Sequence, residues 1–162
     1  IDYIEKHYPS TDAVVLDDAF QHRYVEAGMS ILLVDYNRLI NNDKLLPVGN
    51  LREPISAKLR ASVIVITKCP PQLPPIELRN LYKDIAPRPY QRLFYSYFDY
   101  GQPQTVFGNA PKKFMADMTV LMVTGIAQPT PLVQYLLSQV ATVQTISYPD
   151  HYAFTKSDLA FA

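Results

Sequence analysis

Residues 62–68 read Ser-Val-Ile-Val-Ile-Thr-Lys, a run of branched apolar side chains that ends in a polar pair. Residues 30–35, Ser-Ile-Leu-Leu-Val-Asp, form a second run of this kind, and residues 13–16, Ala-Val-Val-Leu, form a third. All three are continuously apolar instead of alternating, which is typical of parallel strands covered on both faces. The sequence therefore predicts three buried strands of a parallel sheet.

Helical patterns follow these strands. Pro54 opens an expected helix with Ile55 and Leu59 facing inward, and residues 75–86 predict another. The inward positions of the second are Leu78, Leu81, Tyr82 and Ile85. Alternation of strands and helices indicates an α/β fold, in which ligands bind outside the carboxyl ends of the strands. Asp17, Asp18, Asp35 and Lys68 are expected there.

The C-terminal part of the chain has a different residue composition. Residues 92–100 are rich in aromatic side chains and predict a strand that leads away from the first sheet. Beyond it, an apolar strand at 119–123, a helix at 131–140 and a strand at 142–147 predict one further βαβ unit. The expected inward positions of that helix are Leu132, Val133, Leu136, Leu137 and Val140. We expect a first domain at 1–91, an extended linker at 92–118 and the start of a second, smaller α/β domain at 119–162.

Composition narrows the classes of function. With 162 residues, 48% of them hydrophobic, the chain can bury a core. Its 15 basic and 15 acidic residues cancel, so no overall charge would attract nucleic acid, and we expect no nucleic-acid partner. One cysteine, Cys69, excludes an internal disulfide framework. No apolar run approaches the ~20 residues that span a bilayer, so we expect a soluble chain.

Asp17 and Asp18 are the first candidate site. An acidic pair after a buried strand can hold Mg²⁺ through one carboxylate while its neighbour orients a nucleophile, although a helix cap or a solvated turn has the same composition. Gln21 and His22 follow closely, so several polar side chains stand near one another in sequence. They would either face a polar ligand or lie in an exposed loop.

Residues 46–54, Leu-Pro-Val-Gly-Asn-Leu-Arg-Glu-Pro, form the second candidate. Gly49 permits a turn with positive φ, and Arg52 offers two parallel donors to phosphate or carboxylate. Arg52 could equally pair with Glu53 or with an aspartate of a neighbouring loop. His151, beside Asp150 after the last expected strand, is a candidate general base, although a lone histidine is more often structural or exposed.

The sequence lacks the two common glycine-rich motifs of nucleotide-binding loops. The chain has five glycines and contains neither Gly-x-x-x-x-Gly-Lys-[Ser/Thr] nor Gly-x-Gly-x-x-Gly, so residues 1–162 cannot build a phosphate-binding loop of those types.

Four segments in order resemble the signature segments of the tetraacyldisaccharide 4′-kinases, the lipid A 4′-kinases. They are residues 17–23 (Asp-Asp-Ala-Phe-Gln-His-Arg), residues 46–54, residues 124–129 (Thr-Gly-Ile-Ala-Gln-Pro) and residues 149–151 (Pro-Asp-His). Ala19 stands where many members carry glycine, which requires a backbone conformation open to a side chain.

The resemblance implies transfer of the γ-phosphate of ATP, with Mg²⁺, to the 4′-hydroxyl of a tetraacyldisaccharide 1-phosphate, a lipid A precursor. It implies a sheet like that of P-loop NTPases, a second smaller domain, and a place at the cytoplasmic face of the inner membrane of Gram-negative bacteria through segments absent here. Asp18 and His151 match catalytic residues, and Asp17 matches a residue near the metal. Arg52, Gln21 and His22 match positions near substrate or phosphate.

Some segments of the family have no match in this sequence, and this leads to a further expectation. The family's N-terminal membrane helix, phosphate loop and last helices have no counterpart in residues 1–162, so we expect these residues alone to be inactive.

Two other classes remain open. A phosphoacceptor receiver module also places an acidic pair, an aspartate and Thr-Lys after successive strands, as Asp17-Asp18, Asp35 and Thr67-Lys68 do here. Only residues 19–34 separate Asp18 from Asp35, however, whereas a receiver needs on the order of 40 residues there. A non-catalytic interaction domain with a binding edge at residues 93–100 is the third interpretation.

Overall fold

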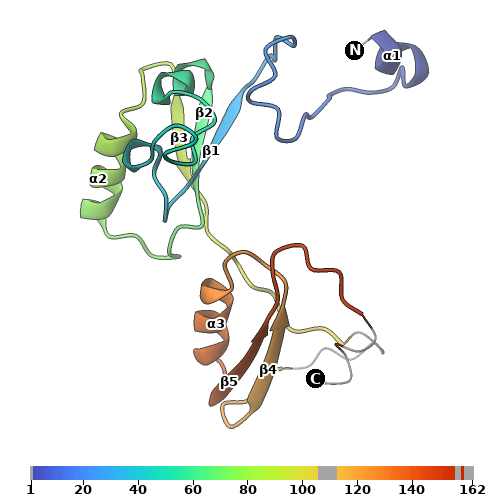
Figure 1. The fold of residues 1–162 in the computed structure, drawn as a ribbon, viewed down its shortest axis with the longest axis vertical. Helices are drawn as coiled ribbons and strands as arrows, with labels where there is room; N and C mark the ends of the chain where they lie inside the picture. The colour runs from blue at the N-terminus through green and yellow to red at the C-terminus, as the bar shows by residue number, and fades with distance from the viewer. Residues whose placement is uncertain (1, 106–112, 156–157, 159–162) are drawn as a thin grey trace. The chain divides into compact units, whose positions relative to one another are not determined.

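The computed structural model describes residues 2–105, 113–155 and 158. The chain divides into two compact units, Ile1–Asp99 and Tyr100–Ala162. Each unit is a parallel sheet with helices, so the predicted α/β class with parallel strands is confirmed (Figure 1). The middle of the expected linker, residues 106–112, lies outside the described residues. The division into a first domain at 1–91, a linker at 92–118 and a second domain at 119–162 stays a prediction.

The first unit contains a three-stranded sheet in the order β1-β2-β3, with every pair parallel. Its strands are β1 (Ile31–Asp35), β2 (Val63–Thr67) and β3 (Arg92–Tyr95). The register places Val34 beside Ile66 and Asp35 beside Thr67, so the charged residues after both strands meet at one edge of the sheet. The strands expected at 30–35 and 62–67 are therefore confirmed.

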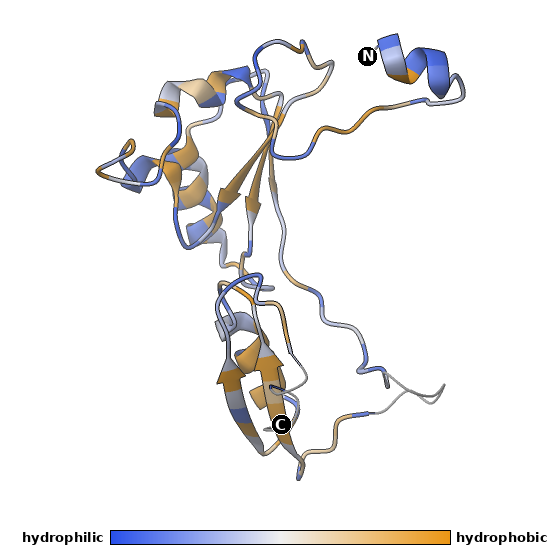
Figure 2. Ribbon diagram, turned by 45° about the vertical axis from the view of Figure 1, so that its right-hand side comes forward, coloured by the Kyte–Doolittle hydropathy of each residue, from blue (hydrophilic) through white to orange (hydrophobic). Residues whose placement is uncertain are grey.

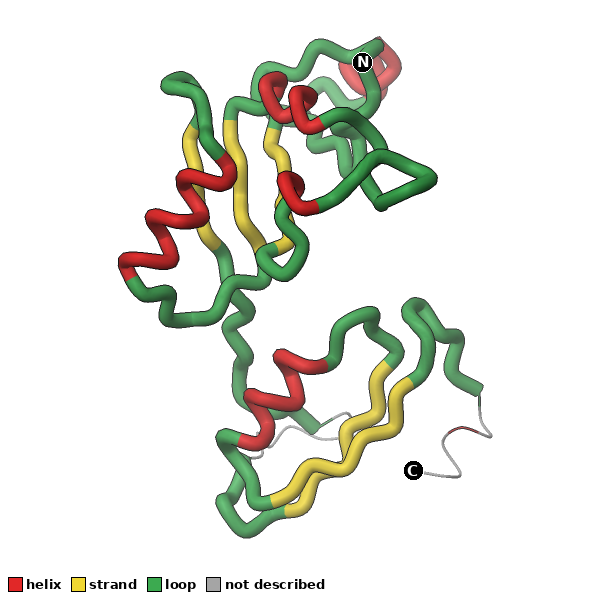
Figure 3. The backbone as a smooth tube through the Cα atoms, turned by 60° about the vertical axis from the view of Figure 1, so that its left-hand side comes forward, coloured by secondary structure: helices red, strands yellow, loops and turns green. Residues whose placement is uncertain are grey.

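Helices cover one face of this sheet. The α-helix α2 (Pro75–Ile85) lies along it in Figure 3, and the short 3-10 helices η1 (Ile40–Asn42) and η2 (Ile55–Arg60) belong to the same unit. Proline at the first position of α2 suits a helix start, because its missing N–H would have had no partner there. The buried core of the unit consists of Val34, Ala61, Ile64, Ile66, Cys69, Leu81 and Ile85.

The opposite face of the sheet is not covered within the described residues. Ile31, Leu33 and Phe94 are exposed there, as the burial alternation of β1 shows. We expected strands covered on both faces, and this expectation is wrong for the sheet as described. The helices in the connections from β1 to β2 and from β2 to β3 leave its second face without a covering helix.

Three other expectations for the first unit are wrong. Residues 13–16 form no strand, and Val15 is 90% exposed. A strand needs a neighbour for its backbone hydrogen bonds, and this apolar segment runs beside none. The strand at β3 pairs with β2 instead of leading away from the first sheet, and it ends at Tyr95. Ile55 and Leu59 in η2 are 36% and 39% exposed and Tyr82 in α2 is 56% exposed, so none of the three is buried as expected.

The second unit is one βαβ arrangement, as predicted. Its strands β4 (Thr119–Thr124) and β5 (Thr142–Ser147) pair in parallel, and α3 (Thr130–Leu137) connects them. Met122, Leu136 and Val140 form the buried centre, while Leu137 is exposed, contrary to its expected inward position. Figure 2 shows apolar colouring on the strands of both sheets and on the helices of both units.

The remaining regular element is the N-terminal helix α1 (Asp2–His7), which has no buried residue. No helix in the described ranges is both long and apolar enough to cross a lipid bilayer.

Candidate functional site

The acidic pair lies in a turn instead of at a strand end. Asp17 Oδ1 accepts the backbone N–H of Asp18 at 3.0 Å, and Asp18 has a positive φ of 47°. Aspartate adopts this left-handed conformation more readily than most residues, because its short side chain can bond the local backbone. The following Ala19 avoids positive φ, so the replacement of glycine there is compatible with the local backbone.

Arg52 reaches this turn from the second candidate segment. Its Nη1 donates to Asp18 Oδ1 at 3.2 Å and to Oδ2 at 3.1 Å, although 34 residues separate them in sequence. Of the partners considered for Arg52, the structure selects the aspartate of the neighbouring loop. Two signature segments, residues 17–23 and 46–54, therefore meet.

Two further contacts join the same segments. Glu53 Oε2 lies 2.6 Å from Arg60 Nη2 and 3.6 Å from Arg23 Nη2. Arg60 also donates to the Phe20 carbonyl at 3.1 Å and places its guanidinium 4.7 Å from the centre of the Phe20 ring. The hydrogen bond from Arg60 holds the pKa of the Glu53 carboxyl below its ordinary value, although partial burial opposes this.

Sequence reasoning missed Arg60 and underrated Glu53. Glu53 stands inside the quoted segment and could have been singled out, because an acid between Arg52 and Pro54 has basic groups within reach. Arg60 gave no signal, since the end of a short helix is an ordinary place for arginine.

In sequence, Gln21 and His22 lie between Phe20, which Arg60 contacts, and Arg23, which lies near Glu53. Gln21 is half-buried, whereas His22 is exposed and its backbone N–H donates to the Ala19 carbonyl at 2.9 Å. The structure places both beside the turn of Asp18 and leaves their roles as predictions.

His151 belongs to the second unit. Its φ is 57°, its ring is 95% exposed, and Nε2 lies 3.7 Å from Asp150 Oδ2. Its backbone N–H donates to the Gly125 carbonyl at 3.2 Å, so the segment 149–151 rests against the segment 124–129. A Cβ at Gly125 would lie 3.3 Å from the Pro149 carbonyl oxygen, so a side chain there would require the two segments to move apart slightly.

Aromatic rings support the turn that carries His151. Tyr148 and Tyr152 stack with ring centres 4.5 Å apart, and Phe154 meets both edge-on. Partial burial raises the pKa of the Tyr152 hydroxyl, and the neighbouring Asp158 raises it further.

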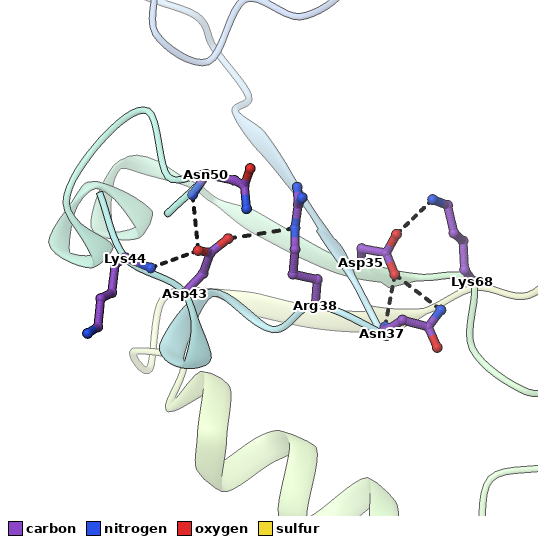
Figure 4. A network of polar contacts seen from close by, with 7 residues as sticks. All are labelled: Asp35, Asn37, Arg38, Asp43, Lys44, Asn50 and Lys68. Carbon is purple, nitrogen blue, oxygen red and sulfur yellow. Dashed lines mark hydrogen bonds and ion pairs between the residues drawn. The ribbon is translucent and has the colours of Figure 1, made fainter. Parts of the chain in front are cut away.

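At the edge where β1 and β2 end, a second polar network ties the strands together (Figure 4). Lys68 Nζ donates to Asp35 Oδ2 at 2.7 Å, and the backbone N–H of Asn37 donates to Asp35 Oδ1 at 2.8 Å. Partial burial raises the pKa of Asp35, but the hydrogen bonds from Lys68 and Asn37 outweigh it, so this pKa lies below its ordinary value. Asp35 and Lys68 thus meet at the carboxyl ends of the strands, as predicted.

The carboxylates that a metal ion could use at this site are those of the acidic pair, Asp17 and Asp18. Among residues 2–105, 113–155 and 158, no three His, Cys, Asp or Glu side chains are grouped to hold an ion. Mg²⁺ commonly takes only one or two carboxylates and keeps several waters, so the exposed Asp17 and Asp18 fit its requirements as a pair.

The fold and these contacts define an α/β protein of parallel sheets in which charged side chains from separate segments gather on loops beside the first sheet. The whole chain, residues 1–162, matches the family described as tetraacyldisaccharide-1-P 4′-kinase. The chain belongs to this family.

Individual relatives agree. The tetraacyldisaccharide 4′-kinase of Phocaeicola vulgatus is 44% identical over 155 residues, which cover 93% of this chain and 42% of that protein. Those of Bacteroides thetaiotaomicron and Porphyromonas gingivalis are 41% and 40% identical over 162 and 146 residues, covering 93% and 90% of this chain and 43% and 41% of those proteins. The chain thus spans less than half the length of these relatives. No solved structure matches it.

Proposed function

We propose that the protein acts in a kinase that transfers the γ-phosphate of ATP to the 4′-hydroxyl of a tetraacyldisaccharide 1-phosphate, a precursor of lipid A. The observation that carries this proposal is the contact of Arg52 with both carboxylate oxygens of Asp18. It brings together two segments that resemble family signatures, and membership of the family supports the reaction.

The proposed roles follow from the chemistry of phosphoryl transfer, in which positioning and charge stabilisation do most of the work. Asp18 accepts the proton of the attacking hydroxyl or orients that hydroxyl, and His151 assists in moving the proton. Arg52 provides two parallel donors that suit a phosphate as well as the carboxylate it now contacts. Gln21 and His22, beside the turn of Asp18, donate to substrate or phosphate oxygens.

Asp17 is the proposed metal ligand. Mg²⁺, when bound with ATP, neutralises the negative charge of the phosphates. The carboxylate of Asp17 would hold it.

Backbone geometry supports the choice of Asp18 and His151. Four residues other than glycine have positive φ in the described part of the chain, and these two are among them. Such conformations cost free energy and cluster at functional sites.

We further propose that residues 1–91 form part of a P-loop-like kinase domain and that residues 119–162 begin a second domain. We propose that the reaction takes place at the cytoplasmic face of the inner membrane, as the resemblance to the family implies. ATP and the lipid A precursor are the proposed partners.

The test uses the complete product of the gene, incubated with Mg-ATP and a tetraacyldisaccharide 1-phosphate, with the product identified by mass spectrometry. We expect a gain of one phosphate on the 4′-oxygen. Asp18→Asn should lower the rate by roughly 100-fold or more, the range for loss of a general base. Asp12→Asn, which removes another exposed carboxylate outside these contacts, is the matched control. Absence of the product, or equal rates for the two variants, would contradict the proposal.

A receiver-like phosphoacceptor is the alternative that a specific contact favours, because Lys68 lies 2.7 Å from Asp35. Incubation with acetyl phosphate tests it: labelling at Asp35 would support that alternative, and absence of labelling would close it.

A further inference from the structure

The segment that carries Arg52 is a closed loop. Leu45 and Leu51 form an isolated bridge, the Leu46 N–H donates to the Leu51 carbonyl at 3.0 Å, and the Leu51 N–H donates to the Lys44 carbonyl at 2.9 Å. Arg52 follows the closing residue directly. The direction in which its side chain leaves the loop therefore depends on how the base of the loop is held.

A single carboxylate holds that base. Asp43 Oδ1 accepts the backbone N–H groups of Lys44 at 2.8 Å and of Asn50 at 3.0 Å, which lie on the two sides of the loop (Figure 4). Asp43 Oδ2 lies 3.7 Å from Arg38 Nε, and the Asp43 side chain is only 11% exposed. Hydrogen bonds to an ionised carboxylate are stronger than neutral ones, so Asp43 joins both ends of the loop at one point.

Gly49 shows how closely the loop fits around this carboxylate. A Cβ at Gly49 would lie 2.5 Å from Asp43 Oδ1 and 2.2 Å from the Lys44 carbonyl oxygen. The φ of Gly49 lies outside the left-handed region, so the expected turn with positive φ is not the reason for glycine here. Glycine is required because the carboxylate and the backbone occupy the space of a side chain.

The contact between Arg52 and Asp18 needs such support. Both side chains are largely exposed, at 61% and 76%, so the pair by itself holds neither group firmly. Within the loop, the backbone on the N-terminal side of Arg52 is fixed through Leu51, and Leu51 pairs with the segment that Asp43 holds.

We propose that Asp43 is a positioning residue for Arg52: its carboxylate closes the loop 43–51 so that the Arg52 guanidinium is presented to Asp18. This inference rests on the proposed function, because it assigns to Asp43 a part in the same phosphoryl transfer. Asp43 itself touches neither Arg52 nor Asp18 in any contact described above, so it acts through the loop.

The kinetic test compares Asp43→Ala with Asp43→Asn in the complete product of the gene. Misplacement of a substrate-binding group by about 1 Å can cost up to about 100-fold, so Asp43→Ala should lower kcat/KM for the disaccharide by about 10- to 100-fold. Asparagine keeps one carbonyl oxygen that can accept the same N–H groups, so Asp43→Asn should recover most of this loss. A purely structural role would instead lower the amount of folded enzyme and leave kcat/KM per folded molecule unchanged, which would overturn the proposal.

A second measurement does not depend on activity. The guanidinium Nη1–H resonance of Arg52 reports its contact with Asp18, and Asp18→Ala, which leaves no side-chain oxygen to accept this N–H, defines the position of that resonance without the contact. Asp43→Ala should move it toward that position. Asp35→Ala, which removes another carboxylate that accepts a backbone N–H at the same edge of the sheet, is the matched control and should leave it in place.

The two measurements separate the possible failures. If the unsubstituted protein transfers no phosphate, the proposed function fails while the Arg52 resonance still decides the role of Asp43. If phosphate is transferred and Asp43→Ala leaves the resonance unmoved, the role of Asp43 is refuted and the proposed function stands.

Discussion

Arg52 and Asp18 form an ion pair whose energetic role can be judged from its exposure. Pairs between exposed side chains contribute only about 0.2–1 kcal/mol to folding, because water screens the charges and both side chains lose freedom. With 61% and 76% of the side chains exposed, this pair adds little to stability. Its two hydrogen bonds, both donated by Arg52 Nη1, are better explained as a binding arrangement whose partner can be exchanged.

Gly49 provides a residue-scale prediction. Gly49→Ala should destabilise the first unit by about 1–3 kcal/mol, the usual cost of forcing an extra carbon into a filled space. Gly28→Ala is the matched control, because a Cβ there meets nothing within 4 Å. It should change stability by no more than about 0.5 kcal/mol. Urea unfolding of both variants measures this, and equal stabilities would contradict the described fit of the loop.

At this scale the sequence indicated which residues matter but not which of them meet. Arg52 had several possible partners within the sequence, and only the fold brings Asp18 to it. Asp43 was missed because it contacts backbone N–H groups, and Arg60 was missed because it contacts the carbonyl of Phe20, which is distant in sequence. A pattern of residue types carries no information about such contacts.

The strands allow a prediction at the scale of elements. Ile64 in β2 is 0% exposed, whereas Leu33 in β1 is 65% exposed, although both are apolar residues in paired strands. Ile64→Ala should cost about 2–5 kcal/mol of unfolding free energy, because it leaves a cavity in the core. Leu33→Ala should cost about 0.5 kcal/mol or less. Similar losses in chemical denaturation would show that the uncovered face of the sheet is buried in solution.

The tie between the ends of β1 and β2 predicts a dependence on pH. Since the pKa of Asp35 is lowered in the folded state from 3.8, its contribution to stability is complete above pH 3.8 and is lost as the pH falls through the lower folded-state value. Asp35→Asn should therefore be less stable than the unsubstituted protein at neutral pH, and the difference should shrink in acid below pH 3.8. Thermal unfolding at several pH values measures it. A constant difference would mean that the charge of Asp35 does not matter.

Elements were predictable where local pattern and pairing agree. The strands at β1, β2, β4 and β5 and the helix α2 stand close to their predicted ranges, because continuous apolar runs and proline starts are local signals. Residues 13–16 carry the same signal yet form no strand, since pairing depends on a neighbour that the pattern does not specify. For β3 the aromatic run predicted an extended strand, but its partner is a property of the whole sheet.

At the scale of the whole molecule, the sequence allows a prediction about nucleotide binding. Residues 1–162 contain no glycine-rich phosphate loop of the known types, so by themselves they should bind Mg-ATP weakly or not at all. Isothermal titration of these residues measures this directly. Micromolar affinity would show that another part of residues 1–162 holds the phosphates.

The central claim is that the segments 17–23 and 46–54 work as one phosphoryl-transfer site. Its most direct test is a double-mutant cycle of Asp18→Asn and Arg52→Ala on the rate of 4′-phosphorylation by the complete product of the gene. Residues that act as a unit show losses that do not add, so the double variant should be about as slow as the slower single variant. Losses that multiply, as for two independent sites, would contradict the claim.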